Sequence, residues 1–422
     1  MNAKSSSLAI VPALVLALLL IPIGVATLSL LGTALDWKGG WWAHSLEPLQ
    51  SASGSFEAVL NTPGFWTSAG LSYWIGILTA LISLTIVMLF IATFLSSGWF
   101  VWIWGIMKPV LAVPHAVAAF GLLFLIAPSG FLIRLVSPEL SGFERPPDWL
   151  VVNDPAGLSL ALGLILKEIP FLFFVTMAAL PQTDFRRTRI AASMGYGRIW
   201  SWFLSVFPGV YLQIRLPVFA VIAFASSTID VALILGPVAP PTLSVRILHW
   251  MNDPDLSMRT TAAAGAIIQV AITLLAVLTW WAGEYLVLNL GRMAALRGWR
   301  FKRDKFLRFL SSLLMATSVL VVSVGLVLLA LWSFAGVWRF PDALPRVWTL
   351  RSWSAEASNL WATGVRATII ALGAATLSLA LVLASLENEY RNNRRATRLA
   401  WWTIYVPLLV PQIAFVGGLS VL

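Results

Sequence analysis

Three ionisable side chains lie within apolar stretches of the sequence. Lys167 and Glu168 are neighbours in one stretch, and Asp230 follows three small polar residues in another. A charge inside a membrane is costly and usually serves a functional pathway, so all three are candidates for a translocation pathway. Adjacent residues on a helix point about 100° apart, so Lys167 and Glu168 cannot both face one partner. The alternatives for this pair are a structural lock between helices and a position at the membrane edge.

The composition offers little to other kinds of chemistry. The chain has no cysteine and three scattered histidines, so we expect neither a disulfide framework nor a metal site. It has no G-x4-G-K-[ST] phosphate-binding loop, and we expect no cofactor. A membrane-embedded enzyme would need clustered His, Asp or Glu side chains near one leaflet, and here they are dispersed. His115 follows Pro114, and we expect it to donate a hydrogen bond to a carbonyl that the proline frees.

A basic, small-residue loop separates the two charged apolar stretches. Its sequence from Arg189 to Pro208 is RIAASMGYGRIWSWFLSVFP, in which arginines lead into small residues, two glycines and an amphipathic aromatic run. Small side chains on a short helix let another protein approach the backbone closely, and a glycine allows the turn that ends the helix. The pattern indicates a docking element. Its candidate residues are Arg186, Arg187, Arg189, Ala191, Ala192, Gly195, Gly197 and Pro208.

This loop resembles the EAA loop of binding-protein-dependent ABC import permeases, whose pattern is E-A-A, three residues, G, nine residues, then I-x-L-P. Gly195 and Pro208 take the glycine and the proline at the family's spacing, and Ala191 takes the second alanine. The departures are Arg189 for glutamate, Ile190 for the first alanine, Ser205 for isoleucine and Phe207 for leucine. Over about residues 60–290 the chain is similar to one half of the fused two-half permeases of the iron(III) and thiamine import class.

The resemblance implies a transport function without catalysis by this chain. A cytoplasmic ABC ATPase dimer would hydrolyse ATP, and a periplasmic or extracellular solute-binding protein would deliver the solute. Ala191, Ala192 and Gly195 would form the face that approaches the ATPase, with Arg186 and Arg187 beside it. Arg189 in place of glutamate puts in doubt any salt bridge that the family makes there, and a compensating acidic residue would be needed to keep one. The alternative is an ion-coupled secondary transporter, in which the three intramembrane charges would couple transport to an ion.

The composition predicts the elements that position these residues. Of 422 residues 59% are apolar and 11% are charged, with a mean hydropathy of +0.86, which is typical of an all-α polytopic membrane protein in a lipid bilayer. We expect about six spans per permease half. The predicted spans are about 8–35, 71–95, 101–127 (broken by Pro109 and Pro114), 158–180, 216–235, 262–288, 309–334 and 363–386, followed by a proline-broken ninth.

The distribution of charge predicts the orientation. The net charge of +10 indicates cytoplasmic loops rather than nucleic-acid binding, because Lys and Arg gather on the inner side of membrane proteins. Basic residues outnumber acidic ones in the docking loop and in the segments 292–308 and 391–398. We therefore expect the N-terminus and the docking loop to be cytoplasmic, in the inner membrane of a bacterial cell.

The chain also repeats itself at an offset of 297 residues. Pro114 and Gly121 correspond to Pro411 and Gly418, although proline and glycine also recur by chance in membrane helices. A real repeat would give two permease halves of the same orientation. We expect a first half at 1–300, with its docking loop at about 181–214, and an incomplete second half at 301–422. The second docking glycine would fall near position 492, so we expect a fragment or a truncated gene.

Overall fold

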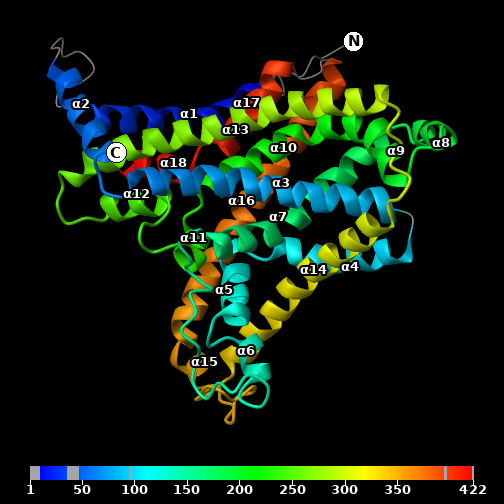
Figure 1. Ribbon diagram of the computed structural model, residues 1–422. Coiled ribbons are helices and arrows are strands. Elements are labelled where there is room, and N and C mark those ends of the chain that lie inside the picture. Colours follow the sequence, from blue (N-terminus) through cyan, green and yellow to red (C-terminus); the bar gives the residue numbers. More distant parts are fainter. Residues whose placement is uncertain (1–9, 36–46, 96, 394–396, 421–422) are drawn as a thin grey trace.

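The computed structural model describes residues 10–35, 47–95, 97–393 and 397–420. Helices make up most of this part of the chain, and its one β feature is an isolated bridge between Ala335 and Trp348. Eight helices there are long and apolar enough to cross a membrane (Figure 1). The protein is therefore an all-α polytopic membrane protein, as the composition predicts.

The eight candidate spans are α1 (Val11–Ala34), α3 (Phe65–Phe94), α5 with α6 (His115–Ile126 and Phe131–Val136), α7 (Leu158–Ala179, extended by the short helix Leu180–Gln182), α10 (Phe207–Ser227), α13 (Met258–Leu296), α14 (Lys305–Ser333) and α16 (Ala357–Asn392). The shorter helices are α2 (Glu47–Leu60), α4 (Gly98–Ala112), α8 (Arg186–Ser193), α9 (Arg198–Ser205), α11 (Asp230–Leu235), α12 (Leu243–Met251), α15 (Arg351–Ala355), α17 (Arg398–Leu409) and α18 (Gln412–Ser420).

Two of the predicted spans differ from the helices observed. The span 101–127 was predicted to break at Pro109 and at Pro114. The break at Pro114 is confirmed, because α4 and α5 are separate helices that meet there, whereas the break at Pro109 is wrong, because Pro109 lies inside α4 without ending it. The predicted span 216–235 begins at Phe207 instead and is interrupted after Ser227. Pro208 lies in the first turn of α10, where its missing N–H costs nothing, so it opens this helix and does not close the aromatic run.

Helix α3 is the centre of the core. It packs against α7, α10, α13 and α14, and two thirds of its most apolar window is buried (Figure 1). Phe90 of α3 and Phe173 of α7 are fully buried and in ring contact with each other. Gly76 allows close approach, because a Cβ there would lie 2.9 Å from the carbonyl oxygen of Ile222 in α10. Small residues therefore set the helix spacing, as is usual in membrane bundles.

The helix ends recur at the same offset as the sequence motifs. Helix α4 ends at Ala112 and α17 ends at Leu409, while α5 begins at His115 and α18 begins at Gln412. These bounds are each 297 residues apart. The two prolines of the repeat thus interrupt helices at equivalent points, and the division into two permease halves remains a prediction.

The helices that follow the two prolines, α5 and α18, each pack against a helix from the other part of the chain. Helix α5 lies against α14, where a Cβ added to Gly121 would be 2.9 Å from the carbonyl carbon of Gly325. Helix α18 lies against α1, where Gly418 touches the backbone of Ala26. Each broken helix therefore contacts the first long helix of the other part of the chain, which joins the two parts through glycine contacts.

Candidate functional site

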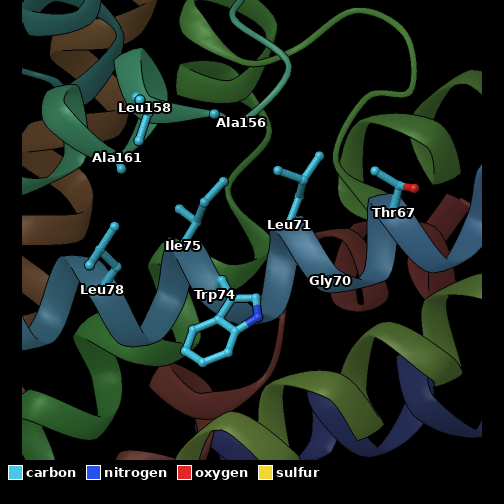
Figure 2. Close-up of a pocket in the computed structure, with 10 residues that line it drawn as sticks. Thr67, Gly70, Leu71, Trp74, Ile75, Leu78, Ala156, Leu158 and Ala161 are labelled. Carbon is cyan, nitrogen blue, oxygen red and sulfur yellow. The ribbon is translucent and has the colours of Figure 1, made fainter.

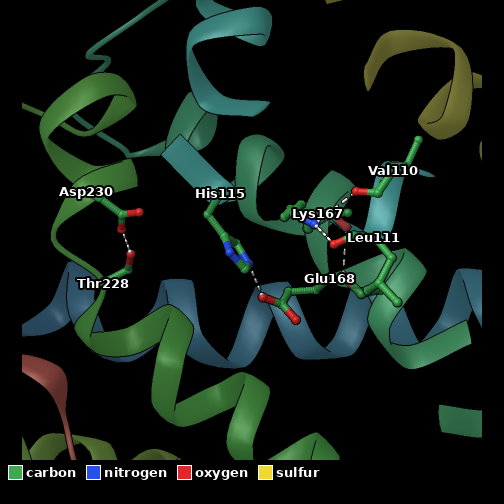
Figure 3. Close-up of polar contacts among 9 residues, drawn as sticks. Val110, Leu111, His115, Lys167, Glu168, Thr228 and Asp230 are labelled. Atoms are coloured by element: carbon green, nitrogen blue, oxygen red, sulfur yellow. Dashed lines mark hydrogen bonds and ion pairs between the residues drawn. The ribbon is translucent and has the colours of Figure 1, made fainter. Parts of the chain in front are cut away.

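The break at Pro114 leaves backbone carbonyls at the end of α4 that need donors. Proline has no N–H, so the carbonyl of Val110 loses its usual helical partner four residues later. The ammonium of Lys167 takes that place: its Nζ donates to the carbonyl oxygens of Val110 at 3.1 Å and Leu111 at 2.8 Å (Figure 3). Lys167 is buried, and it fixes α7 to the end of α4.

Glu168 binds the other side of the same break. Its Oε1 lies 3.1 Å from Nε2 of His115, the first residue of α5, and the Glu168 side chain is only 6% exposed (Figure 3). The expectation that His115 donates to a freed carbonyl is therefore wrong, because Lys167 occupies those carbonyls. The His115 ring also packs on Phe224 of α10, with ring centroids 4.6 Å apart.

These contacts explain how Lys167 and Glu168, whose side chains point in different directions, both bind the interrupted helix α4–α5. Lys167 binds the end of α4 and Glu168 binds the start of α5, so the pair straddles the break. Such a break is the kind of irregular backbone that membrane proteins tolerate only inside a protein core or beside a water-filled cavity.

Asp230 lies at a second break, between α10 and α11. Thr228 donates from its Oγ1 to Oδ1 of Asp230 at 2.8 Å, and Asp230 is exposed (Figure 3). The structure gives this carboxylate a hydrogen bond with Thr228 rather than with Lys167 or Glu168. Helix α11 packs against α5, so the two breaks belong to neighbouring helices.

A buried polar network, which the sequence analysis missed, lies beside the second break. Gln269 of α13 is fully buried and donates from Nε2 to the carbonyl of Ser226 at 3.0 Å. The hydroxyls of Ser226 and Thr273 are 3.0 Å apart. The signal that could have found it is the spacing of Gln269 and Thr273, which places two polar residues on one face of an apolar helix.

A second cluster joins α10 to α13 further along these helices. Arg215 binds Glu284 through two contacts, Nη2 to Oε2 at 2.7 Å and Nε to Oε1 at 3.1 Å. Tyr211 donates to the same carboxylate at 2.6 Å and accepts a hydrogen bond from Trp280 Nε1 at 2.7 Å. The bidentate pairing fixes one end of α10, next to the docking loop.

The docking loop forms two short helices around a glycine turn. Arg186, Arg187, Arg189 and Ala192 of α8 are exposed, and Ala191 is half-buried. Gly195 has a φ of +87°, a left-handed conformation that favours glycine, and it turns the chain into α9.

The two glycines of this loop face the segment that joins α13 to α14. A Cβ on Gly195 would lie 3.3 Å from Nη1 of Arg300, and Gly197 is buried against the backbone of Phe301. Helix α8 has no buried residue, whereas Ile199, Ser201 and Trp202 of α9 are buried.

An apolar groove of about 410 Å³ lies between α3 and the start of α7 (Figure 2). Its lining includes Leu71, Trp74, Ile75 and Leu158, with Thr67 as its one hydroxyl side chain. Such a lining suits hydrocarbon rather than a charged solute. In the described part of the chain, no three His, Asp or Glu side chains lie close enough together to hold a metal ion.

Asp154 fixes the start of α7 and so the position of the Lys167 and Glu168 pair. Its carboxylate accepts hydrogen bonds from the backbone N–H groups of Leu158 at 2.8 Å and Ser159 at 2.9 Å, and from the Ser159 hydroxyl at 2.8 Å. Burial alone would raise the pKa of Asp154. The hydrogen bonds from Ser159 and Leu158 outweigh it and leave the pKa below its ordinary value.

Replacing Asp154 with alanine is expected to lower the free energy of unfolding by about 1 kcal/mol at neutral pH, the usual contribution of such a cap. The folded-state pKa is lowered, so this contribution is present above the unfolded value of about 3.9 and is lost as the pH falls through the folded-state pKa. Thermal unfolding in detergent at neutral pH and at about pH 3 measures both. Asp148→Ala, which removes an exposed carboxyl of the same loop, is the control, and an equal loss at both pH values would contradict the assignment.

Comparison with known proteins shows a partial likeness. No protein-family model matches the chain. Over 179 residues it is 31% identical to the inner membrane ABC transporter permease protein YnjC of Escherichia coli (strain K12). The matched part is 40% of this chain and 32% of that relative, so the chain spans about a third of the relative's length.

Proposed function

We propose that the chain is a permease subunit of an ABC importer in the bacterial inner membrane. It carries a solute from the exterior or periplasm to the cytoplasm, powered by ATP hydrolysis on a partner ATPase dimer. A solute-binding protein outside the membrane delivers the solute. The partial likeness to a permease and the eight candidate spans support this proposal.

The observation that carries the proposal is the exposed surface of α8. None of its eight residues is buried, and three of them are arginines. Ile190, on α8, and Met194, which directly follows it, are four residues apart and expose 61% and 58% of their surface. An apolar pair flanked by positive charges suits a partner cleft that is apolar at its base and acidic at its rim.

The pathway is proposed to pass the two helix breaks. Lys167 and Glu168 hold the break at Pro114, and Asp230 lies at the neighbouring break before α11. Interrupted helices at a membrane midplane present backbone dipoles and polar side chains to a solute. We propose that these three side chains line the pathway when the breaks separate.

The positive-inside rule supports the cytoplasmic orientation of α8 and of the N-terminus in this proposal. Arg394 and Arg395, which contribute to the predicted inner charge, lie outside the described residues.

The second candidate is an ion-coupled secondary transporter. The His115 and Glu168 contact favours it, because a paired histidine and carboxylate inside a membrane can carry a proton. Such a transporter would need neither ATP nor an ATPase partner.

Ala192→Arg tests the proposal on the exposed face of α8. The long charged side chain is expected to clash with the ATPase and to lower vanadate-sensitive ATP hydrolysis in the purified complex by about tenfold, a loss of about 1.4 kcal/mol in docking. Leu256→Arg adds the same charge at an exposed position between α12 and α13 and is expected to have no effect. A full-length chain that purifies without any ATP-hydrolysing partner would favour the secondary transporter.

A further inference from the structure

The segment between α13 and α14, residues 297–304, is bound to the docking loop by several specific contacts. The N–H of Gly197 donates to the carbonyl of Arg300 at 2.9 Å, and the N–H of Ile199 donates to Oδ2 of Asp304 at 3.3 Å. The rings of Trp200 and Phe301 are 4.7 Å apart at their centroids. The basic composition of this segment suggests a solvated loop, yet it is packed against α9.

The contact at Gly197 requires the absence of a side chain. A Cβ at this position would collide with the backbone carbonyl of Phe301, which no side-chain rotation can move away. The φ of Gly197 is −62°, a value that any residue adopts, so its substitution would report the collision alone.

The segment itself is held in an uncommon shape. Phe301 has a φ of +36°, and a bulky residue adopts such a value only where its surroundings enforce it. Phe301 lies between Trp200 of α9 and Trp299, whose ring centroid is 5.9 Å from its own. The aromatic contacts therefore fix the backbone that accepts the hydrogen bond from Gly197.

Helix α14 begins directly after this segment and leads to the pathway residues. It starts at Lys305 and packs against α5 where Gly325 meets Gly121. Helix α5 begins at His115, the partner of Glu168. A continuous series of contacts thus joins α9 to the segment, to α14, to α5 and to the break at Pro114.

We propose that residues 297–304 form a clasp that makes α9 and α14 move as one body, so that a force on α8 reaches the break at Pro114 through α14. Gly197, Phe301 and Asp304 are its positioning residues. The inference rests on the proposed function, since it assigns a route to the movement that an ATPase would impose on α8.

Gly197→Ala tests the clasp, with Gly209→Ala as its matched control. The nearest atom to a Cβ on Gly209 is 3.9 Å away, so alanine fits there. The full chain contains no cysteine, so nitroxide labels can be placed at Leu320→Cys of α14 and Leu162→Cys of α7, both of which are exposed. Double electron–electron resonance then measures the distance between the two labels in the complex with the ATPase, before and after trapping with ATP and vanadate.

In the unsubstituted and Gly209→Ala complexes, trapping is expected to shift the distance between the labels. In the Gly197→Ala complex the ATPase is expected to stay bound and to hydrolyse ATP, with the shift lost. A Gly197→Ala complex that shows the full shift would overturn the clasp. If the unsubstituted complex shows no shift, or no ATPase binds, the proposed function fails instead.

A second variant separates a transmitting role from a role in folding. Phe301→Cys with Trp200→Cys removes the ring contact and is expected to lose the shift. For this variant the two spin labels are attached to ketone-bearing amino acids instead of cysteines, so that only residues 200 and 301 carry thiols. Bridging the two thiols with a flexible bismaleimide is expected to restore it. A bridge that forms without restoring the shift would show that α9 and α14 need to separate, and would overturn the proposal.

Discussion

Replacing Gly121 with leucine is expected to prevent α5 and α14 from assembling. A Cβ at Gly121 would lie 2.9 Å from the carbonyl carbon of Gly325 and 3.1 Å from its oxygen, and backbone on both sides cannot yield as a side chain can. Overpacking a tight contact costs about 1–3 kcal/mol, and a clash between two backbones belongs at the upper end of that range. We therefore expect a large loss of monodisperse protein on size-exclusion chromatography in detergent.

The control for this experiment is Gly105→Leu. Gly105 lies in α4 with open space around it, so the same substitution adds the same apolar volume without a clash. Gly325→Leu approaches the contact from the other helix and is expected to reproduce the loss. If Gly121→Leu and Gly105→Leu give equal yields and equal thermal stability, α5 and α14 do not pack at this point.

Replacing Lys167 with methionine is expected to lower the free energy of unfolding by about 3 kcal/mol. Hydrogen bonds to a charged group contribute about 1.5–3 kcal/mol. Here the carbonyls of Val110 and Leu111 would both lose the ammonium, and Val110 would keep only the long hydrogen bond from the N–H of Val113 at 3.4 Å. Methionine keeps the apolar stem, so the loss reports the ammonium. Denaturant unfolding in mixed micelles measures it, with the exposed Lys108→Met as the control.

Pro114→Ala provides a sharper form of this test. Alanine supplies the N–H that proline lacks, and that N–H can bind the carbonyl of Val110 within a continuous helix. In the Pro114→Ala background, Lys167→Met is therefore expected to cost at least about 1 kcal/mol less than in the unsubstituted chain. Equal costs in both backgrounds would show that Lys167 does not serve the break. Full stability combined with an inactive complex would assign Lys167 to solute contact.

The sequence predicted most spans because an apolar run of sufficient length has few alternatives to a membrane helix. It did not distinguish Pro109 from Pro114, which are chemically identical. Pro109 stays within α4, whereas the residue before Pro114 has the extended backbone that ends the helix, with a ψ of 131° at Val113. Which proline interrupts a helix depends on donors from other helices, and Lys167 supplies them only at the second.

The candidate site was predictable in its residues but not in its contacts. Lys167 and Glu168 stand out as charges within an apolar run, yet the partners of Lys167 and Glu168 lie more than fifty residues away on α4 and α5. A short exposed helix was expected from the small and basic residues of α8, and its docking role stays a prediction. The attachment of Phe301 to Gly197 was not expected, because the segment's many positive charges are typical of a solvated loop.

The contacts of α5 with α14 and of α18 with α1 also have a consequence for biosynthesis. Ala26 and Gly418 touch although they lie about 390 residues apart in the chain. At a synthesis rate of about 5–20 residues per second, α1 spends tens of seconds in the bilayer before α18 exists. During that time lipid alone surrounds much of its surface, and α1 has the highest hydropathy of the eight candidate spans. The native bundle can therefore close only late, and a slow codon or a stalled ribosome after α13 would leave α5 without α14 and exposed to aggregation.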